Sequence, residues 1–263
     1  MPSRQPVLVF LLSIIGMLSS VGMFAPAQSA LAAAPLIVDT FESPLRSGSV
    51  GGIPIGFNTF QDPNSSVAIS TTTAAPASSV PGASVPNTVL KLDLNVVSFA
   101  GFTHGFESAT LDQWVTQDWS AYEGLSFWLY GNNSGTTMFV DVLDNRNSPE
   151  KTNDDAERWS VSFQDNFSGW QEIKLPFASM SRKEIGNGAP NDGFGLTEVH
   201  GWALGTITTP SAQAYYVDNV MVYGVAPIRP LTVGFSAISY KVTEGTTATI
   251  IAKLSKPSSD PVT

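Results

Sequence analysis

Hydrophobic and polar residues alternate along most of the chain between positions 36 and 223. The alternation is clearest in Val89–Leu94 and Leu125–Tyr130. A period of two is typical of strands that bury one face, and here Gly, Pro, Asn and Asp bound the runs. The expected strands are 36–41, 89–94, 125–130, 138–143, 159–163, 171–175, 200–204 and 215–223. With no convincing helical period, the pattern predicts an all-β fold, a two-sheet antiparallel β-sandwich.

Short connections suggest which strands pair. The turn Gly131–Gly135 joins strands 125–130 and 138–143, which predicts a hairpin. Strands 159–163 and 171–175 are expected to form the next pair. Residues 65–86 are rich in Ser, Thr, Ala and Pro and are either a loop or a weak edge strand.

The N-terminal residues 1–34 have the pattern of a secretory signal. Arg4 precedes an apolar stretch, Val7–Phe24, and the small residues Ala30 and Ala32 match a cleavage site. We expect cleavage after Ala32 or Ala34, although an uncleaved membrane anchor is the alternative. The expected product is secreted, extracellular or on a bacterial cell surface, and does not contact the membrane.

The periodicity breaks at residues 225–230, where Pro227 and Pro230 predict a linker. Two further strands are expected at 231–235 and 247–254. Residues 231–263 are too few to bury a core of their own, so they predict a truncated second β domain.

Composition narrows the possible functions. The chain has 263 residues, of which 43% are hydrophobic and only 13% charged, and its net charge is −9. The acidic balance argues against nucleic acid as a partner. The sequence has no cysteine and two histidines, His104 and His200. Disulfides, thiolate zinc sites and a Cys nucleophile are therefore excluded, and a multi-histidine metal site is not expected.

Five segments in order carry a resemblance to a known family. They are Val38–Glu42, Asp118–Phe127, Asp155–Trp159, Ser168–Phe177 and Tyr216–Val220. This series resembles the sequence of family 11 carbohydrate-binding modules. The complex-I-intermediate-associated family shares several of the same short sequence motifs. The resemblance implies a galactose-binding-like jelly roll over residues 35–224. It also implies a non-catalytic module that binds a polysaccharide, with β-glucan as the family's ligand, within a larger secreted enzyme or surface protein.

The resemblance also implies binding residues in a cleft on one sheet. The family's cleft aromatics fall near Phe57 or Phe60 and on Phe102, its acid on Asp155, and its base on Lys183 beside Arg182. His200 and Thr206 stand where the family has an acid and a tyrosine, and Ile185 and Gly186 replace another such pair. For the three phenylalanines, an ordinary place in the core is the equal alternative. Trp119, Trp128, Trp159, Trp170 and Trp202 are predicted to be core, and Trp114 exposed.

The acidic residues of the chain favour a calcium-binding site over a catalytic site. The first and last strands of a sandwich are often neighbours, which would bring Asp39 and Glu42 close to Asp218. Calcium takes six to eight oxygen ligands, so these three are the predicted ligands of a structural Ca²⁺; the alternative is that they cap strand ends. Asp141, Asp144, Asp154, Asp155 and Glu157 are candidates by type for a hydrolytic carboxylate pair. We interpret them as turn residues or acceptors for sugar hydroxyls, with Asp141 able to point into a concave face.

The C-terminal segment 233–245 resembles the start of a Calx-beta domain, with Glu244 at the position of a calcium ligand. This resemblance implies a partial Ig-like β domain at the C-terminus. Further domains are therefore expected to be covalently linked. The alternative to sugar binding is a structural or adhesive extracellular module, and a small hydrolase is the least favoured function.

Overall fold

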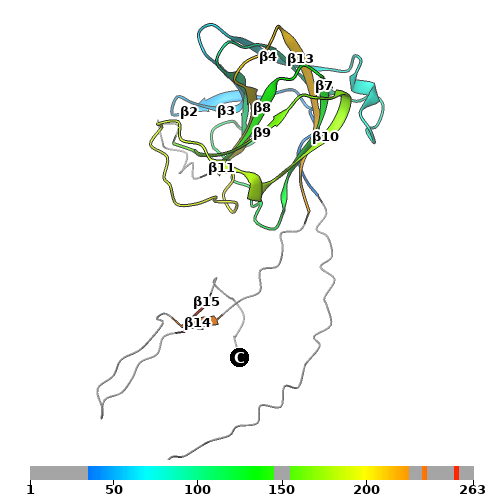
Figure 1. Cartoon of the computed structure of the whole chain (residues 1–263). Helices are drawn as coiled ribbons and strands as arrows, with labels where there is room; N and C mark the ends of the chain where they lie inside the picture. The colour runs from blue at the N-terminus through cyan, green and yellow to red at the C-terminus, as the bar shows by residue number, and fades with distance from the viewer. Residues whose placement is uncertain (1–34, 145–154, 225–232, 236–251, 255–263) are drawn as a thin grey trace, which may run out of the picture. The chain divides into compact units, whose positions relative to one another are not determined.

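The computed structural model describes residues 35–144, 155–224, 233–235 and 252–254 of the chain (Figure 1). Almost all of its regular structure is strand, with only the two short 3-10 turns η1 (Ala77–Ser79) and η2 (Phe177–Ser179) besides. The strands form two antiparallel sheets that face each other. The prediction of an all-β sandwich is confirmed.

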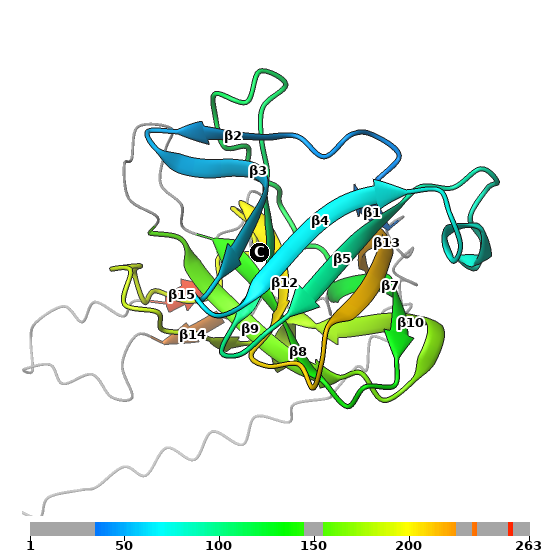
Figure 2. The ribbon, with the colours of Figure 1, turned by 90° about the horizontal axis from the view of Figure 1, so that it is seen from above.

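The sheets are mixed in chain order (Figure 2). The six-stranded sheet has the order β10 (Ser168–Pro176), β7 (Gly124–Asn132), β13 (Gln213–Tyr223), β5 (Val89–Asn95) and β4 (Ser66–Thr72), with β1 (Leu36–Asp39) also paired to β13. The seven-stranded sheet has the order β11 (Ser181–Arg182), β9 (Glu157–Gln164), β8 (Thr137–Asp144), β12 (Gly201–Thr206), β6 (Ala100–Gly105), β3 (Ile53–Gln61) and β2 (Ser47–Val50). The Ser- and Thr-rich region 65–86 thus contributes an edge strand, β4, followed by a loop.

Both predicted hairpins are wrong. β7 and β8 follow each other in the chain but lie in different sheets, and so do β9 and β10. The turn between β7 and β8 is held by Asp165 of the β9–β10 connection, whose carboxylate accepts hydrogen bonds from the backbone N–H groups of Asn132, Asn133 and Ser134 at 3.1 Å. Each turn therefore carries the chain across the sandwich, because both strands have an apolar face to bury in the same core.

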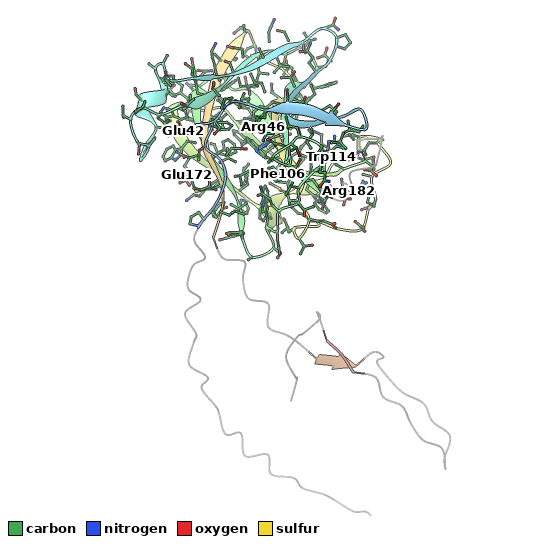
Figure 3. All side chains as sticks on the ribbon, turned by 180° about the vertical axis from the view of Figure 1, so that it is seen from behind. Glu42, Arg46, Phe106, Trp114, Glu172 and Arg182 are labelled. Atoms are coloured by element: carbon green, nitrogen blue, oxygen red, sulfur yellow. The ribbon has the colours of Figure 1, made fainter. Side chains whose placement is uncertain are left out.

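The core lies between the sheets (Figure 3). Its fully buried side chains include Leu90, Leu92, Leu125, Phe127 and Leu129 of the six-stranded sheet and Phe102, Met138, Val140, Val142 and Trp202 of the seven-stranded sheet. Of the tryptophans predicted as core, Trp119 and Trp202 are fully buried, whereas Trp128, Trp159 and Trp170 are half-buried. Trp114, predicted to be exposed, is also half-buried.

Near the C-terminus the described residues form one short antiparallel pair, β14 (Val233–Phe235) with β15 (Ala252–Leu254). Both strands fall inside the ranges expected from the sequence. The residues predicted to be a signal sequence, those predicted to be a linker and the rest of the segment that resembles a Calx-beta domain lie outside the described residues. Across the described part of the chain, no helix has the length and apolar character needed to cross a membrane.

Candidate functional site

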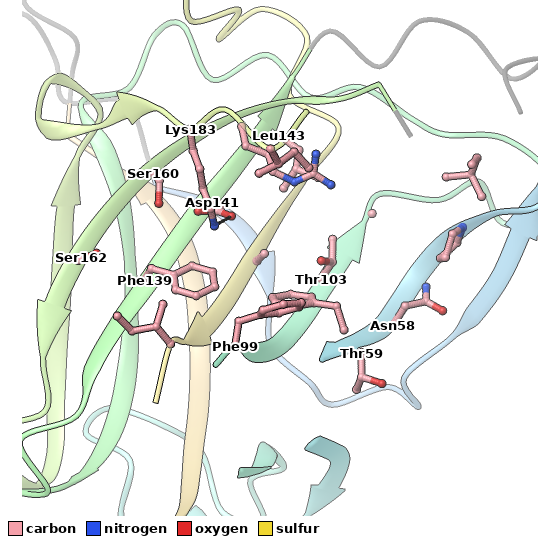
Figure 4. Close-up of a pocket in the computed structure, with 18 of the residues that line it drawn as sticks. Asn58, Thr59, Phe99, Thr103, Phe139, Asp141, Leu143, Ser160, Ser162 and Lys183 are labelled. Atoms are coloured by element: carbon pink, nitrogen blue, oxygen red, sulfur yellow. Dashed lines mark hydrogen bonds and ion pairs between the residues drawn. The ribbon is translucent and has the colours of Figure 1, made fainter. Parts of the chain in front are cut away.

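A cleft of about 750 Å³ lies on the outer face of the seven-stranded sheet (Figure 4). Period-two alternation creates its lining. In β8, Phe139, Asp141 and Leu143 face the cleft, while the residues between them, Val140 and Val142, belong to the core. The other lining residues come from β3, β6, β9 and β12 and from nearby loops, and include Asn58, Phe60, Phe99, Thr103, Arg158, Ser160, Ser162, Lys183 and Ile185.

Strand register explains why this face is hollow. The two central strands, β6 and β12, present only small residues outward: Gly101, Thr103 and Gly105 from one, and Gly201, Ala203 and Gly205 from the other. The flanking strands β3 and β8 carry larger side chains at the same levels, except at Gly56 of β3, which stands opposite Gly105. The result is a trough that runs along β6 and β12, with a floor of small residues and walls of larger ones.

Two aromatic rings close over the floor at one level of the trough. Phe60 and Phe139 stand opposite Gly101 and Gly205, respectively, across the strand pairs. A Cβ atom on Gly101 would lie 2.7 Å from the Phe60 ring, and one on Gly205 would lie 2.8 Å from the Phe139 ring. The two rings lie 6.3 Å apart between centroids, at an angle of 27°. The glycines therefore allow both rings to lie against the sheet as an apolar platform.

The apolar platform continues to the rim of the cleft. Phe99 precedes β6 and is 45% exposed. Its backbone is held in place, because its N–H donates to the Asp62 carboxylate at 3.1 Å and its carbonyl accepts from the Asp62 N–H at 3.0 Å. The loop thus presents an aromatic ring to a ligand from a rigid backbone.

Polar groups line both walls of the trough. Figure 4 shows Asp141, Ser160, Ser162 and Lys183 toward one side and Asn58, Thr59 and Thr103 toward the other. Lys183 Nζ lies 2.8 Å from Asp141 Oδ2 and 4.0 Å from the centroid of the Phe139 ring. Asp141 Oδ1 has no hydrogen-bond partner among the described residues. Aromatic faces combined with hydroxyl, amide and carboxylate groups suit a polyhydroxylated ligand.

Of the aromatic residues predicted for the cleft, only Phe60 lines it. Phe102 is fully buried and packs edge-on against Trp202 with centroids 5.2 Å apart. Phe57 packs against the core and stacks on His104 at 3.9 Å. Both occupy inward positions of their strands, so they belong to the core instead. The alternative that the sequence left open is the one observed for these two.

Of the polar residues predicted for the cleft, only Lys183 lines it. Arg182 points elsewhere, pairing with Glu157 and with Glu184 at 2.6 Å. Asp155, His200 and Thr206 are buried and are not part of the lining. Thr206 donates to the Thr137 carbonyl at 2.7 Å, so its hydroxyl joins two strands of the sheet.

Several cleft residues were missed by the sequence reasoning. They are Asn58, Phe99, Thr103, Phe139, Ser160 and Ser162. Alternation marked most of them as facing away from their apolar neighbours, but nothing in the sequence distinguished a cleft from an ordinary solvent face. Asp141 was expected to reach a concave face, and it does. Ile185 also lines the cleft, at a position where the resembling family has an acid.

A hydrolytic carboxylate pair is not present in the cleft as described. Among the described acids, Asp141 alone lines the cleft. Asp144 is fully buried and accepts a hydrogen bond from the Gly195 N–H. Burial, aided by the nearby carboxylate of Glu157, raises the pKa of Asp144 to about 7. Asp154 lies outside the described residues.

The three predicted calcium ligands do not converge. β1 does pair with β13, as expected, but Asp39 turns into the core. Its Oδ2 lies 2.8 Å from Trp202 Nε1 and 2.9 Å from His104 Nδ1. Burial lowers the pKa of His104, but Asp39 and Glu107 outweigh burial and raise it to about 9. The cation that balances Asp39 is therefore an imidazolium of the protein itself.

Asp218 and Glu42 have other partners, and Asp218 is also buried. Asp218 sits at a β-bulge, and its Oδ2 accepts from Asn87 Nδ2 at 2.9 Å. Glu42, which is labelled in Figure 3, accepts a hydrogen bond from the Thr88 N–H at 2.9 Å. Burial and the negative charge of Glu42 both raise the pKa of Asp218. Within the described ranges no three acidic or histidine side chains form a metal-binding group. Calcium thus stays a prediction for these two carboxylates alone.

Comparison with known proteins adds a family. The chain matches the model of the carbohydrate binding domain (family 11) over residues 32–225. The family 11 carbohydrate-binding module of the cellulosomal cellulase Lic26A-Cel5E of Clostridium thermocellum has a similar structure, with a TM-score of 0.53 and 14% identity over 74% of this chain and 97% of that chain. A family 11 module from the same organism, in complex with a beta-1,3-1,4-mixed-linked tetrasaccharide, is also similar. Its TM-score is 0.52, and its sequence is 14% identical over 75% of this chain and 98% of that chain. No curated protein is similar enough in sequence to count as a relative.

Proposed function

The chain belongs to carbohydrate-binding domain family 11, whose members are non-catalytic modules, and on that premise we propose that its cleft binds a polysaccharide chain. The observation that carries the proposal is the trough along β6 and β12, which combines the Phe60–Phe139 platform and the exposed Phe99 with polar walls. A long trough suits a chain better than a single sugar.

The residues of the trough have separable roles in this proposal. The faces of Phe60, Phe99 and Phe139 offer stacking surfaces for the C–H faces of pyranose rings. Asp141 lies at the next level of the wall, where it is buried and holds Lys183, whose partly exposed ammonium group offers donors to sugar hydroxyls. Because this pair is charge-balanced, we propose a neutral polysaccharide.

β-Glucan is the polysaccharide we propose first. The support is the mixed-linked tetrasaccharide in the similar Clostridium thermocellum module. The cleft aromatics of this chain are phenylalanines, which stack but cannot donate a hydrogen bond. Recognition would then depend mainly on ring stacking and chain shape, so xylan and glucomannan belong in the same test.

Substitution of Phe99 tests the proposal. Affinity electrophoresis in gels containing mixed-linkage β-glucan, xylan or glucomannan should retard the wild-type protein. Phe99→Ala removes one stacking face from a rigid backbone, and we expect about tenfold weaker retention. Val97→Ala is the matched control, because Val97 is 60% exposed on the same loop but does not line the cleft.

A structural or adhesive role is the second candidate. Phe99, Ile185 and Ile207 form an exposed apolar rim, which a protein surface can also cover. Absence of retardation by all three glycans, with a folded protein, would favour this role and remove the first proposal.

We further propose that the module is exported and works as one part of a larger protein. The signal-like residues 1–34 and the Calx-beta-like segment 233–245 support this context. Adsorption would then keep an attached domain close to its substrate by raising the effective concentration.

A further inference from the structure

The outer face of the six-stranded sheet carries a straight row of aromatic side chains. Trp170 of β10 stands opposite Tyr130 of β7, and Tyr130 stands opposite Tyr216 of β13. These three strands are neighbours in the sheet (Figure 2). The residues next to them, including Leu129 and Val217, are buried in the core, so the row faces away from it.

The three rings form one contact chain and are only half-buried. Tyr130 packs edge-on against Trp170 with centroids 5.5 Å apart, and against Tyr216 with centroids 5.9 Å apart. Neither tyrosine hydroxyl has a hydrogen-bond partner within the described part of the chain. Trp170 and Tyr216 also pack against the buried cluster of Ala77, Val80 and Val89, so part of each ring is covered and the rest is open to solvent.

A wall and a polar rim border the row. On one side is the β4–β5 connection. The indole Nε1 of Trp170 anchors this connection by donating a hydrogen bond to the Pro76 carbonyl at 3.0 Å. On the other side, the next level of the sheet carries Asn132 and Asp93. A hollow of about 340 Å³, lined in part by Asp93 and Ala214, continues from this rim.

Charge indicates the class of ligand. Lys91 extends the aromatic row on β5, but its Nζ lies 2.8 Å from Asp93 Oδ2, so the strip carries a balanced pair. A neutral, polyhydroxylated chain fits aromatic faces, phenol hydroxyls and one compensated ion pair. Adjacent strands are about 4.8 Å apart, which is close to the length of one pyranose residue.

The geometry points to a second glycan-binding surface, made by Trp170, Tyr130 and Tyr216, on the sheet opposite the cleft. Its ligand is a neutral polysaccharide that crosses the strands of the six-stranded sheet. The module then binds two chains, one on each face. This surface does not depend on the proposed function of the cleft, since it shares no residue with the cleft.

Fluorine NMR of the full chain labelled with 5-fluorotryptophan tests the inference. The chain has six tryptophans, and Trp170→Phe assigns the Trp170 signal. Titration with cellohexaose, xylohexaose and a mixed-linkage glucan hexasaccharide should shift the Trp170 signal and leave that of the fully buried Trp202 in place. The same shift is expected in Phe60→Ala/Phe99→Ala, where the cleft is disabled.

Substitution within the row should then weaken binding at this surface. Tyr130→Ala should lower the affinity measured from the Trp170 signal by about fivefold. Ile37→Ala is the control, because Ile37 is exposed on β1 and outside the row. Should Tyr130→Ala disturb the Trp202 signal, Tyr130→Phe replaces it and removes only the hydroxyl. A Trp170 signal unmoved by all three oligosaccharides, or one that stops responding in the cleft variant, overturns the inference.

Discussion

His104 lies at the centre of a buried charge network. His104 is only 8% exposed; its Nδ1 lies 2.9 Å from Asp39 and its Nε2 lies 3.0 Å from Glu107. The imidazole also stacks on Phe57. His104→Gln keeps a polar side chain of similar length but removes the positive charge between the two carboxylates.

The magnitude follows from the pKa. Asp39 and Glu107 overcome the effect of burial and raise the pKa of His104 from 6.5 to about 9, which corresponds to about 3 kcal/mol of stability. Folding favours the protonated form, so this stability is complete below about pH 6.5 and is lost as the pH rises through about 9. The free-energy difference between wild type and His104→Gln should therefore shrink by about 3 kcal/mol between pH 6 and pH 10.

Urea unfolding of both proteins at several pH values is the assay. Taking the difference between the two cancels the titration of groups that they share. NMR adds a direct check, because the chain has only two histidines and the variant leaves one imidazole signal. A difference that stays constant with pH would refute the reasoning, and Asp39 would then need another counter-charge.

Three shorter predictions concern other sites. Chelation should lower the melting temperature of the wild type and leave Asp218→Asn unaffected, if that carboxylate holds calcium; identical scans with and without chelator contradict this. Lys183→Met should destabilise the fold by about 1–3 kcal/mol in urea, because the buried Asp141 loses its cation, and Asp141→Asn in the same protein should restore part of the loss. Gly205→Ala places a Cβ atom 2.8 Å from the Phe139 ring and 2.6 Å from a backbone carbonyl, so we expect about 1–3 kcal/mol lower stability and weaker glycan retention. An unchanged unfolding midpoint would show that the trough floor has more room.

Local alternation placed the strands that have a clear period of two, but it missed β2, β3, β6 and β11. The expected strands 89–94 and 125–130 are observed as Val89–Asn95 and Gly124–Asn132. Alternation was not sufficient to predict which strands pair, because a short turn between two strands is compatible with a hairpin or with a crossing to the opposite sheet. The Asp165 carboxylate, more than thirty residues from the turn that it holds, decides for the crossing.

The residues of the candidate site could also be predicted only in part from the sequence. A resemblance carried residue by residue led to Phe60 and Lys183, which line the cleft, and also to Phe57 and Phe102, which do not. A shift of one residue along a strand moves a side chain from the cleft face to the core face. At low sequence identity, a resemblance can therefore predict the fold correctly and still assign a residue to the wrong face of its strand.

The amino-acid sequence alone established the all-β class, the positions of the clearly alternating strands, the lack of cysteine chemistry and the family resemblance, since these depend on composition and local period. Only the tertiary structure decided which face of each strand is covered. That choice depends on the partner sheet, which is distant in the chain. It set Gly101 beside Gly205 under the rings of Phe60 and Phe139, and it placed Asp39 beside His104.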